Sequence, residues 1–465
     1  MNKTDNIRDD YKAVIRRLES LFEIGLLGLV FYLVWKYNYR LAFTAPMYGR
    51  GKYVLVGVYA LLTFIIMELC DAFRFGYLKF SETFIASMVS EFLVNFITYF
   101  EISLISNVMV PVWPMLFMTL ADFGISLILC YLYTYIYHLS YVPHNMLLIY
   151  GSDSALDIKF KMETRQDRYT VTEIIHYEEG RDKLIEAISR HDSVILNDIP
   201  AISRNNILKY CYSNEIRTYV VPKITDIIIK GAPDITLFDT PLMLVKGRGL
   251  SRDQKIAKRL LDIVLSLIAI IPFTVLGIIV AIAILIDDGG PVFFVQKRIT
   301  EGGRSFKMYK FRSMKKDLSG DELTNRARQE DSRITRVGRL IRAMRLDEIP
   351  QIINIIKGEM SFVGPRAEHE DDYHKGLSEI SEYGDRLKVK AGLTGYAQIY
   401  GKYNTLSYDK LRLDLIYIEN YSILLDIKLI FMTLIIIFKK ESTEGEDKRE
   451  EMTARRENLL KEKDN

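Results

Sequence analysis

Four long apolar runs occupy the first third of this 465-residue chain and constrain its fold more than any other feature. They lie at residues 18–35, 53–69, 84–110 and 115–137. Each run approaches the roughly 20 residues that an α-helix needs to cross the hydrocarbon core of a bilayer. The sequence therefore predicts a four-helix transmembrane bundle over residues 1–140, and the arginines just before the first run favour a cytoplasmic N-terminus.

Acidic side chains interrupt these runs. Glu68, Glu91, Glu101 and Asp122 lie within the runs or at their edges. Acids at this depth can mark a transport path. Hydrogen bonding inside the helix bundle, or a position at the membrane interface, is the interpretation that we favour.

Charge and cysteine content argue against several classes of protein. The net charge of +3 gives no sign of nucleic-acid binding and no nucleic-acid motif is present, so we expect no nucleic-acid partner. The three cysteines are scattered, and two of them lie in apolar runs. This argues against a disulfide framework or a zinc site.

Between residues 141 and 246 the pattern changes to short apolar strands that alternate with helical stretches. Segments 146–150, 193–196 and 218–221 are typical of buried parallel strands, so a small, doubly wound, Rossmann-like α/β domain is expected. A dinucleotide fingerprint needs G-x-G-x-x-G after the first strand, and only the first glycine, Gly151, is present. We therefore expect a structural or regulatory domain rather than tight NAD binding.

A fifth apolar run, at residues 260–286, could form an ordinary transmembrane span, but its features argue against one. Pro272 lies near its middle, where proline removes a backbone hydrogen bond and kinks a helix. Basic residues precede the run and also follow it, soon after Asp287 and Asp288. Basic flanks belong on the cytoplasmic side of a membrane. Residues 258–286 are therefore predicted to form a re-entrant helix that enters the membrane, bends at Pro272 and returns.

Adjacent carboxylates at Asp347 and Glu348 follow a short amphipathic run with an arginine at every third position from 336 to 345. Pro350 suits the first turn of a second helix, which makes Asp347 a natural N-cap. Free N–H groups at a helix start favour a phosphate or a carboxylate. The acid pair and the basic stripe together suggest phosphate chemistry. A capped surface helix with solvated arginines is the alternative.

The remaining segments complete one soluble or interfacial domain. Residues 293–314 are typical of a β-hairpin whose second arm presents Lys310 and Arg312 on one face. An apolar helix at residues 423–438 carries two charges and suits lying on a bilayer. Residues 316–333 are polar and are expected to form a loop, and the tail at residues 441–465 is almost entirely charged.

Several motifs of this domain resemble those of large bacterial polyprenyl-phosphate glycosyl-1-phosphate transferases, which belong to the monotopic phosphoglycosyl transferase superfamily. Leu-Asp-Glu-Ile-Pro-Gln at 346–351 and Lys-Gly-Glu-Met-Ser-Phe-Val-Gly-Pro-Arg at 357–366 carry the resemblance, together with segments 291–298, 309–314, 392–395 and 417–422. The resemblance implies an α+β monotopic catalytic domain over residues 252–440. Two positions differ from the family pattern. Ala367 stands where the family often has a second proline, and Ile271 stands where many members have serine before Pro272.

The resemblance implies transfer of a sugar-1-phosphate from a UDP-sugar to polyprenyl (undecaprenyl) phosphate, giving polyprenyl-diphosphate-sugar and UMP. This is an initiating step of exopolysaccharide, capsule or O-antigen synthesis. Asp347 is then the nucleophile that forms a covalent phosphosugar intermediate, and Glu348 holds Mg²⁺ or helps to deprotonate the lipid phosphate. The implied substrate-binding residues are Lys310, Arg312, Arg345, Pro365 and Arg366. The arginines beside Asp347 could instead bind lipid headgroups.

The resemblance further implies a multi-pass protein of the bacterial inner membrane, with its catalytic domain on the cytoplasmic face and membrane lipids as partners. A homodimer is compatible with the sequence. The main alternative is a non-enzymatic membrane sensor or transporter with a cytosolic nucleotide-fold domain, which needs inverted repeats or broken spans that the first 140 residues lack. A nucleotide-sugar dehydratase needs the intact glycine fingerprint. A transferase of the sugar alone releases UDP rather than UMP.

Overall fold

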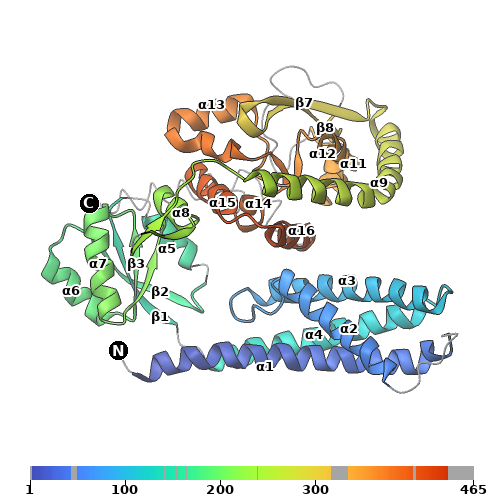
Figure 1. Ribbon diagram of the computed structural model, residues 1–465, viewed down its shortest axis with the longest axis horizontal. Coiled ribbons are helices and arrows are strands. Elements are labelled where there is room, and N and C mark those ends of the chain that lie inside the picture. The colour runs from blue at the N-terminus through green and yellow to red at the C-terminus, as the bar shows by residue number, and fades with distance from the viewer. Residues whose placement is uncertain are drawn as a thin grey trace. The chain divides into compact units, whose positions relative to one another are not determined.

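A computed structural model describes residues 3–42, 50–140, 143–152, 155–163, 165–237, 239–315, 333–401 and 405–437 (Figure 1). The chain forms two units, Met1–Val221 and Pro222–Asn465. Most of the predicted polar loop (residues 316–332) and the predicted charged tail (residues 441–465) lie outside the described residues.

Four long helices open the first unit and pack against one another. They are α1 (Lys3–Val34), α2 (Gly51–Leu69), α3 (Phe80–Ser106) and α4 (Trp113–Ser140), with a short π-helix, η1 (Trp35–Tyr39), and a short 3-10 helix, η2 (Arg40–Ala42), after α1. Helices α1 and α3 each contact both α2 and α4. Among the described residues, five helices are long and apolar enough to cross a membrane: these four and α9 (Arg252–Asp288). The chain is therefore a membrane protein.

Polar side chains inside this group of helices bond to one another. The Asn95 amide donates to Asp122 at 2.8 Å, and the Ser126 hydroxyl lies within hydrogen-bond distance of both Glu23 and Glu91. All five side chains are buried. Hydrogen bonding inside the bundle, which the sequence favoured over a transport path, is confirmed for Glu91 and Asp122.

A four-stranded parallel sheet follows in the first unit, in the order β2-β1-β3-β4. Its elements are β1 (His144–Tyr150), α5 (Ala155–Glu163), β2 (Tyr169–His176), α6 (Arg181–Arg190), β3 (Ser193–Asn197), α7 (Ala201–Ser213) and β4 (Arg217–Val220). Leu147 and Ile149 of β1 pack with α6 and α7, whereas Met146 and Leu148 pack with α5. The α/β domain is thus present, with helices on both faces of its sheet.

Two details of this domain differ from a simple sequence reading. Strand β2 has no counterpart among the predicted strands, because threonine and glutamate separate its apolar residues and leave no continuous apolar run. Gly151, the one fingerprint glycine, is required by packing: a Cβ there would come within 2.4 Å of the carbonyl oxygen of Asp198. Close packing after β1 and β3 therefore accounts for this glycine without a nucleotide.

The second unit begins with α8 (Ile224–Lys230) and the hairpin of β5 (Asp234–Leu237) and β6 (Thr240–Met243). The sequence places these elements in the α/β domain, which was expected to reach residue 246. In the structure, Ile224 and Ile227 are instead buried against α15 (Ser407–Glu419). Residues from Pro222 onward belong to the second unit.

An antiparallel hairpin, two short parallel strands and several short helices complete the second unit. As predicted, the hairpin joins β7 (Phe293–Ile299) and β8 (Ser305–Phe311), here through η3 (Glu301–Gly303). Strands β9 (Ser361–Val363) and β10 (Gly392–Thr394) pair in parallel. The remaining helices are α11 (Arg336–Ala343), η4 (Leu346–Gln351), α12 (Ile352–Lys357), α13 (Glu370–Glu379), η5 (Ser381–Lys388), α14 (Tyr396–Tyr400), α15 and α16 (Ile423–Ile437).

Helix α9 is one continuous helix of 37 residues that contains Pro272 and bends partway along its length (Figure 1). A straight helix of that length would span about 55 Å. Both of its ends contact the rest of the second unit. Near its start, Arg259 donates to the carbonyl of Ile355 at 2.6 Å. At its end, Asp288 accepts a hydrogen bond from Arg312 at 2.7 Å.

The two flanks of this apolar helix also meet at one carboxylate. Lys255, in the first turn of α9, lies 2.6 Å from the carboxylate of Glu301, and Arg304, beyond the helix, lies 3.9 Å from the same group. After α9, the chain therefore comes back to the beginning of that helix.

Candidate active site

The adjacent carboxylates lie on η4, a 3-10 segment between α11 and α12. Arg345 precedes them in a left-handed backbone conformation (φ 54°), which is uncommon for a residue with a side chain and reverses the chain at that point. The prediction that Asp347 is an N-cap is wrong. Arg345 occupies that position, Pro350 lies inside the 3-10 segment, and the α-helix starts only at Ile352.

Two cations hold Glu348. The Nζ atom of Lys310 lies 3.4 Å from one carboxylate oxygen, and the guanidinium of Arg345 lies 3.6 Å from the other. Lys310 comes from β8, which packs directly against η4. The structure thus brings Lys310, Arg345 and Glu348 together beside Asp347, as the predicted site requires.

The two carboxyl groups differ in pKa. Burial, and then the charge of Glu348, raise the pKa of Asp347 to about 6, although Lys310 and nearby arginines oppose this. Burial acts on Glu348 in the same direction. The charges of Lys310, Arg345 and Arg366 outweigh it there and lower the pKa of Glu348 to about 2. Near pH 7, Glu348 is fully ionised, and Asp347 is ionised but close to its protonation range.

Arg366 lies in the loop that follows β9. Its side chain is exposed, and its charge lowers the pKa of both Glu348 and Lys310, so it faces the site. Pro365 is buried, and its carbonyl accepts a hydrogen bond from Gly392 at 2.9 Å. A Cβ at Gly392 would come within 2.1 Å of the backbone of this loop, so only glycine allows the two turns to pack.

Arg298 of β7 is a further cation of the site that the sequence prediction missed. It donates to the carbonyl of Ala367 at 3.1 Å, and burial followed by the charge of Arg366 lowers its pKa to about 10. Strand alternation in the predicted hairpin could have identified Arg298. Lys310 pairs across the hairpin with Phe294, and residues four apart on a strand share a face, which places Arg298 on the same face as Lys310.

Arg312 is engaged elsewhere. Its buried guanidinium donates to Asp288 at 2.7 Å and to the carbonyl of Gly290 at 2.8 Å. These contacts fasten the end of β8 to the end of α9. They give Arg312 a structural role, and its role in substrate binding stays a prediction.

Comparison with known proteins identifies the domain that carries this site. The bacterial sugar transferase family model matches residues 253–440. The exopolysaccharide production protein ExoY of Sinorhizobium fredii is 36% identical over 196 residues, which cover 38% of this chain and 84% of that protein. The chain belongs to the bacterial sugar transferase family.

Longer relatives are similar over part of their length. The undecaprenyl-phosphate glucose phosphotransferase of Komagataeibacter xylinus is 36% identical over 52% of this chain and 48% of its own. The UDP-glucose:undecaprenyl-phosphate glucose-1-phosphate transferase of Klebsiella pneumoniae is 34% identical over 54% of each chain. The chain thus spans about half the length of these two relatives.

Proposed function

We propose that this protein transfers a sugar-1-phosphate from a UDP-sugar to polyprenyl phosphate and releases UMP. The observation that carries the proposal is the pair of adjacent carboxylates, Asp347 and Glu348, with Lys310 and Arg345 in contact with Glu348 and the charge of Arg366 close by. Both substrates are phosphate anions, so cations around a carboxylate nucleophile are what their chemistry needs. The names of the relatives support the same reaction class.

The reaction proceeds in two displacements. A carboxylate oxygen of Asp347 attacks the β-phosphorus of the UDP-sugar, and the bond to the bridging oxygen breaks, so UMP leaves with that electron pair. A phosphate oxygen of the lipid then attacks the same phosphorus and displaces the carboxylate of Asp347. Lys310 and Arg345 neutralise the phosphate oxygens in both steps, and Arg366 binds the diphosphate of the UDP-sugar. A pKa near 6 makes Asp347 more basic than an ordinary aspartate while leaving it ionised at neutral pH.

We further propose that the site holds a magnesium ion. Mg²⁺ takes one or two carboxylates and completes its shell with water and substrate phosphates, so a larger protein ligand set is not required. Among the described residues, no group of three or more His, Cys, Asp or Glu side chains is arranged to hold a metal. Glu348, ionised at all physiological pH values, is the residue that would hold the ion, with Asp347 beside it. The ion would supply further neutralisation of the diphosphate.

We place the site at the cytoplasmic face of the bacterial inner membrane, with α9 as a re-entrant helix. The bend in α9, the contacts at both of its ends and the shared Glu301 carboxylate support this placement. The acceptor phosphate can then reach Asp347 while its polyprenyl chain stays in the bilayer.

The nucleotide product distinguishes this reaction from transfer of the sugar alone. Purified protein, given a UDP-sugar, Mg²⁺ and polyprenyl phosphate, should release UMP, whereas a transferase of the sugar alone releases UDP. Without the lipid acceptor, the protein should release UMP once and gain a sugar-phosphate mass on the peptide that contains Asp347. Release of UDP would contradict the proposed reaction. Turnover without a labelled enzyme would contradict the covalent step.

A further inference from the structure

The loop that carries Arg366 follows directly from β9, and within the part of the chain that the structure describes β9 has a strand on one side only. On that side, the Ser361 amide donates to the carbonyl of Ala391, next to β10. Successive backbone groups of a strand point to opposite edges, so the Phe362 amide points away from β10. An unpaired amide in a buried position needs another acceptor.

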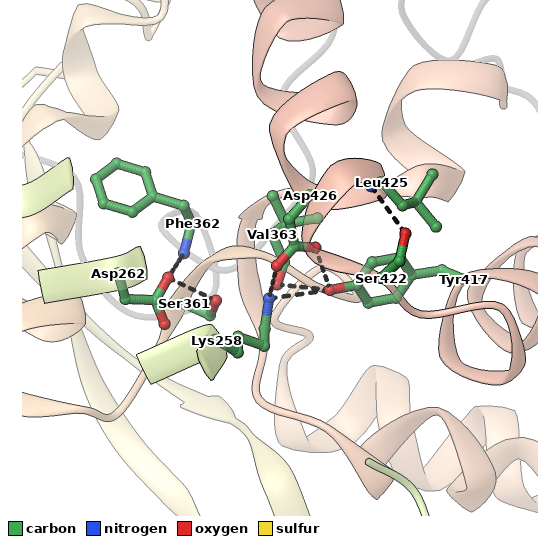
Figure 2. A network of polar contacts seen from close by, with 9 residues as sticks. All are labelled: Lys258, Asp262, Ser361, Phe362, Val363, Tyr417, Ser422, Leu425 and Asp426. Carbon is green, nitrogen blue, oxygen red and sulfur yellow. Dashed lines mark hydrogen bonds and ion pairs between the residues drawn. The ribbon is translucent and has the colours of Figure 1, made fainter. Parts of the chain in front are cut away.

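Asp262 of α9 supplies that acceptor. Its Oδ1 atom accepts from the Phe362 amide at 3.0 Å and from the Ser361 hydroxyl at 2.9 Å, and the Asp262 side chain is 3% exposed (Figure 2). A helix side chain thus replaces the missing neighbouring strand.

The same face of α9 is fixed one turn earlier. Lys258 lies 2.6 Å from Asp426 and 3.0 Å from the Tyr417 hydroxyl, which itself donates to Asp426 at 2.8 Å (Figure 2). All three side chains are buried. Lys258 and Asp262 are four residues apart and therefore share a helix face. These buried contacts fix the first part of α9 against the domain, and they therefore also fix the position of Asp262 beside β9.

We propose that Asp262 is a positioning residue that fixes β9 and thereby sets the place of Arg366 in the active site. The inference rests on the proposed function, since it concerns the phosphates that Arg366 faces. The exposed side chain of Arg366 depends on its backbone for its direction. That backbone is tethered before the loop by Asp262, and after it by the bond from Arg298 to the carbonyl of Ala367.

Three variants of the full-length protein separate this role from a general structural one. Asp262→Leu removes the acceptor at similar side-chain size. Asp262→Asn keeps an Oδ1 acceptor and removes only the charge. Asp253→Leu is the matched control, because Asp253 is an exposed acid of the same helix. Asp262→Leu should raise KM for the UDP-sugar about tenfold with kcat within about threefold, and the other two should stay within about threefold in both.

A double-mutant cycle tests whether Asp262 acts through the loop. In an Arg366→Ala background, Asp262→Leu should add less than about threefold to KM, because the interaction that it disturbs is already absent. Hydrogen exchange of residues 361–367 gives a readout that does not depend on turnover, and Asp262→Leu should speed it. If that variant does not fold, Ser361→Ala removes one of the two bonds and should raise both KM and exchange to a smaller extent.

Three results would overturn the proposal. In the first, Asp262→Leu speeds hydrogen exchange of residues 361–367 but leaves KM unchanged. In the second, the effects of Asp262→Leu and Arg366→Ala on KM are additive. In the third, Asp262→Asn raises KM as much as Asp262→Leu does. A wild-type protein that released no UMP would instead overturn the proposed function. The exchange comparison would then still show whether Asp262 holds the loop.

Discussion

At the scale of single residues, Asp347 and Glu348 carry the same functional group on adjacent positions, yet their surroundings drive their pKa values apart. Glu348 is contacted by Lys310 and Arg345, which stabilise its charge. Asp347 is partly buried beside that ionised neighbour, which destabilises a second negative charge. Separated pKa values in a carboxylate pair indicate separate roles. The stabilised anion suits cation binding, and the destabilised one suits attack on phosphorus.

Replacing Asp347 with asparagine should abolish turnover without unfolding the protein. The amide keeps the shape of the side chain and cannot form the phosphosugar intermediate, so UMP release should fall by roughly 1,000-fold or more, about 4 kcal/mol in the barrier. The melting temperature should stay equal or rise, because the variant removes a charge that the fold disfavours. Turnover within tenfold of wild type would remove Asp347 from the nucleophile's role.

The pH profile of the first UMP release should follow the ionisation of Asp347. A nucleophile with a pKa of about 6 is protonated below that value, so the rate should rise through pH 6 and level off above it. Glu348→Gln removes a like charge and should move the midpoint to lower pH. Lys310→Met removes an opposing cation and should move it to higher pH. Single-turnover rates across pH 5 to 8 measure both shifts, and midpoints that stay equal in the two variants would contradict the assignment.

Local patterns in the sequence predicted some site residues and failed for others, for a physical reason. The acid pair and Lys310 were found because adjacent acids and strand alternation are local signals. Arg312 was placed on the face of Lys310, but it lies one residue past the end of β8, where alternation no longer applies. Its partner Asp288 is brought near by the return of α9, which no local pattern encodes.

At the scale of elements, α9 carries the contact that we propose between the second unit and the membrane. Its middle exposes many apolar side chains, whereas its ends carry polar contacts to the rest of the second unit. On the returning leg, Val280 and Ile284 pack against Phe311 and Ile341, so this leg is part of the domain's own core. A re-entrant helix needs both features, because its two ends must stay attached to the domain while its apolar middle enters the membrane. Pro272 was the only local sign of the bend.

Cysteine labelling tests the topology of α9. Single cysteines at Lys255 and Arg304, in a variant without the three native cysteines, should both be protected from a membrane-impermeant thiol reagent in intact cells. Both should react after lysis. The substitutions are mild, because both side chains are at least half exposed and lose surface ion pairs and, at Arg304, an exposed hydrogen bond to the carbonyl of Glu301. Labelling of position 304 from outside would mean that α9 crosses the membrane.

At the scale of the whole molecule, hydropathy separated the membrane helices from the other domains, and strand spacing revealed the α/β domain. The boundary near residue 246 could not be predicted in the same way. Helix α8 is short, and its apolar residues suit packing on either domain. Its assignment depends on the partner it finds far along the chain in α15. The break after Val221 therefore emerges only from packing.

That boundary yields a test of how far the second unit acts alone. The match to ExoY covers most of that relative with 38% of this chain, which leaves little room there for a counterpart of the first unit. A chain that begins at Pro222 should therefore fold in membranes and retain UMP release. A chain that begins at Gly247 lacks Ile224 and Ile227, and thereby uncovers Leu411 and Leu415, which are now fully buried. Losing two buried isoleucines costs about 2–5 kcal/mol each, so this shorter chain should be unstable.

Proteolysis and UMP release, measured on both chains in membranes, make the comparison. Equal stability of the two would show that α8 is dispensable to the catalytic core, and loss of activity in the longer one would show that the first unit takes part in the reaction.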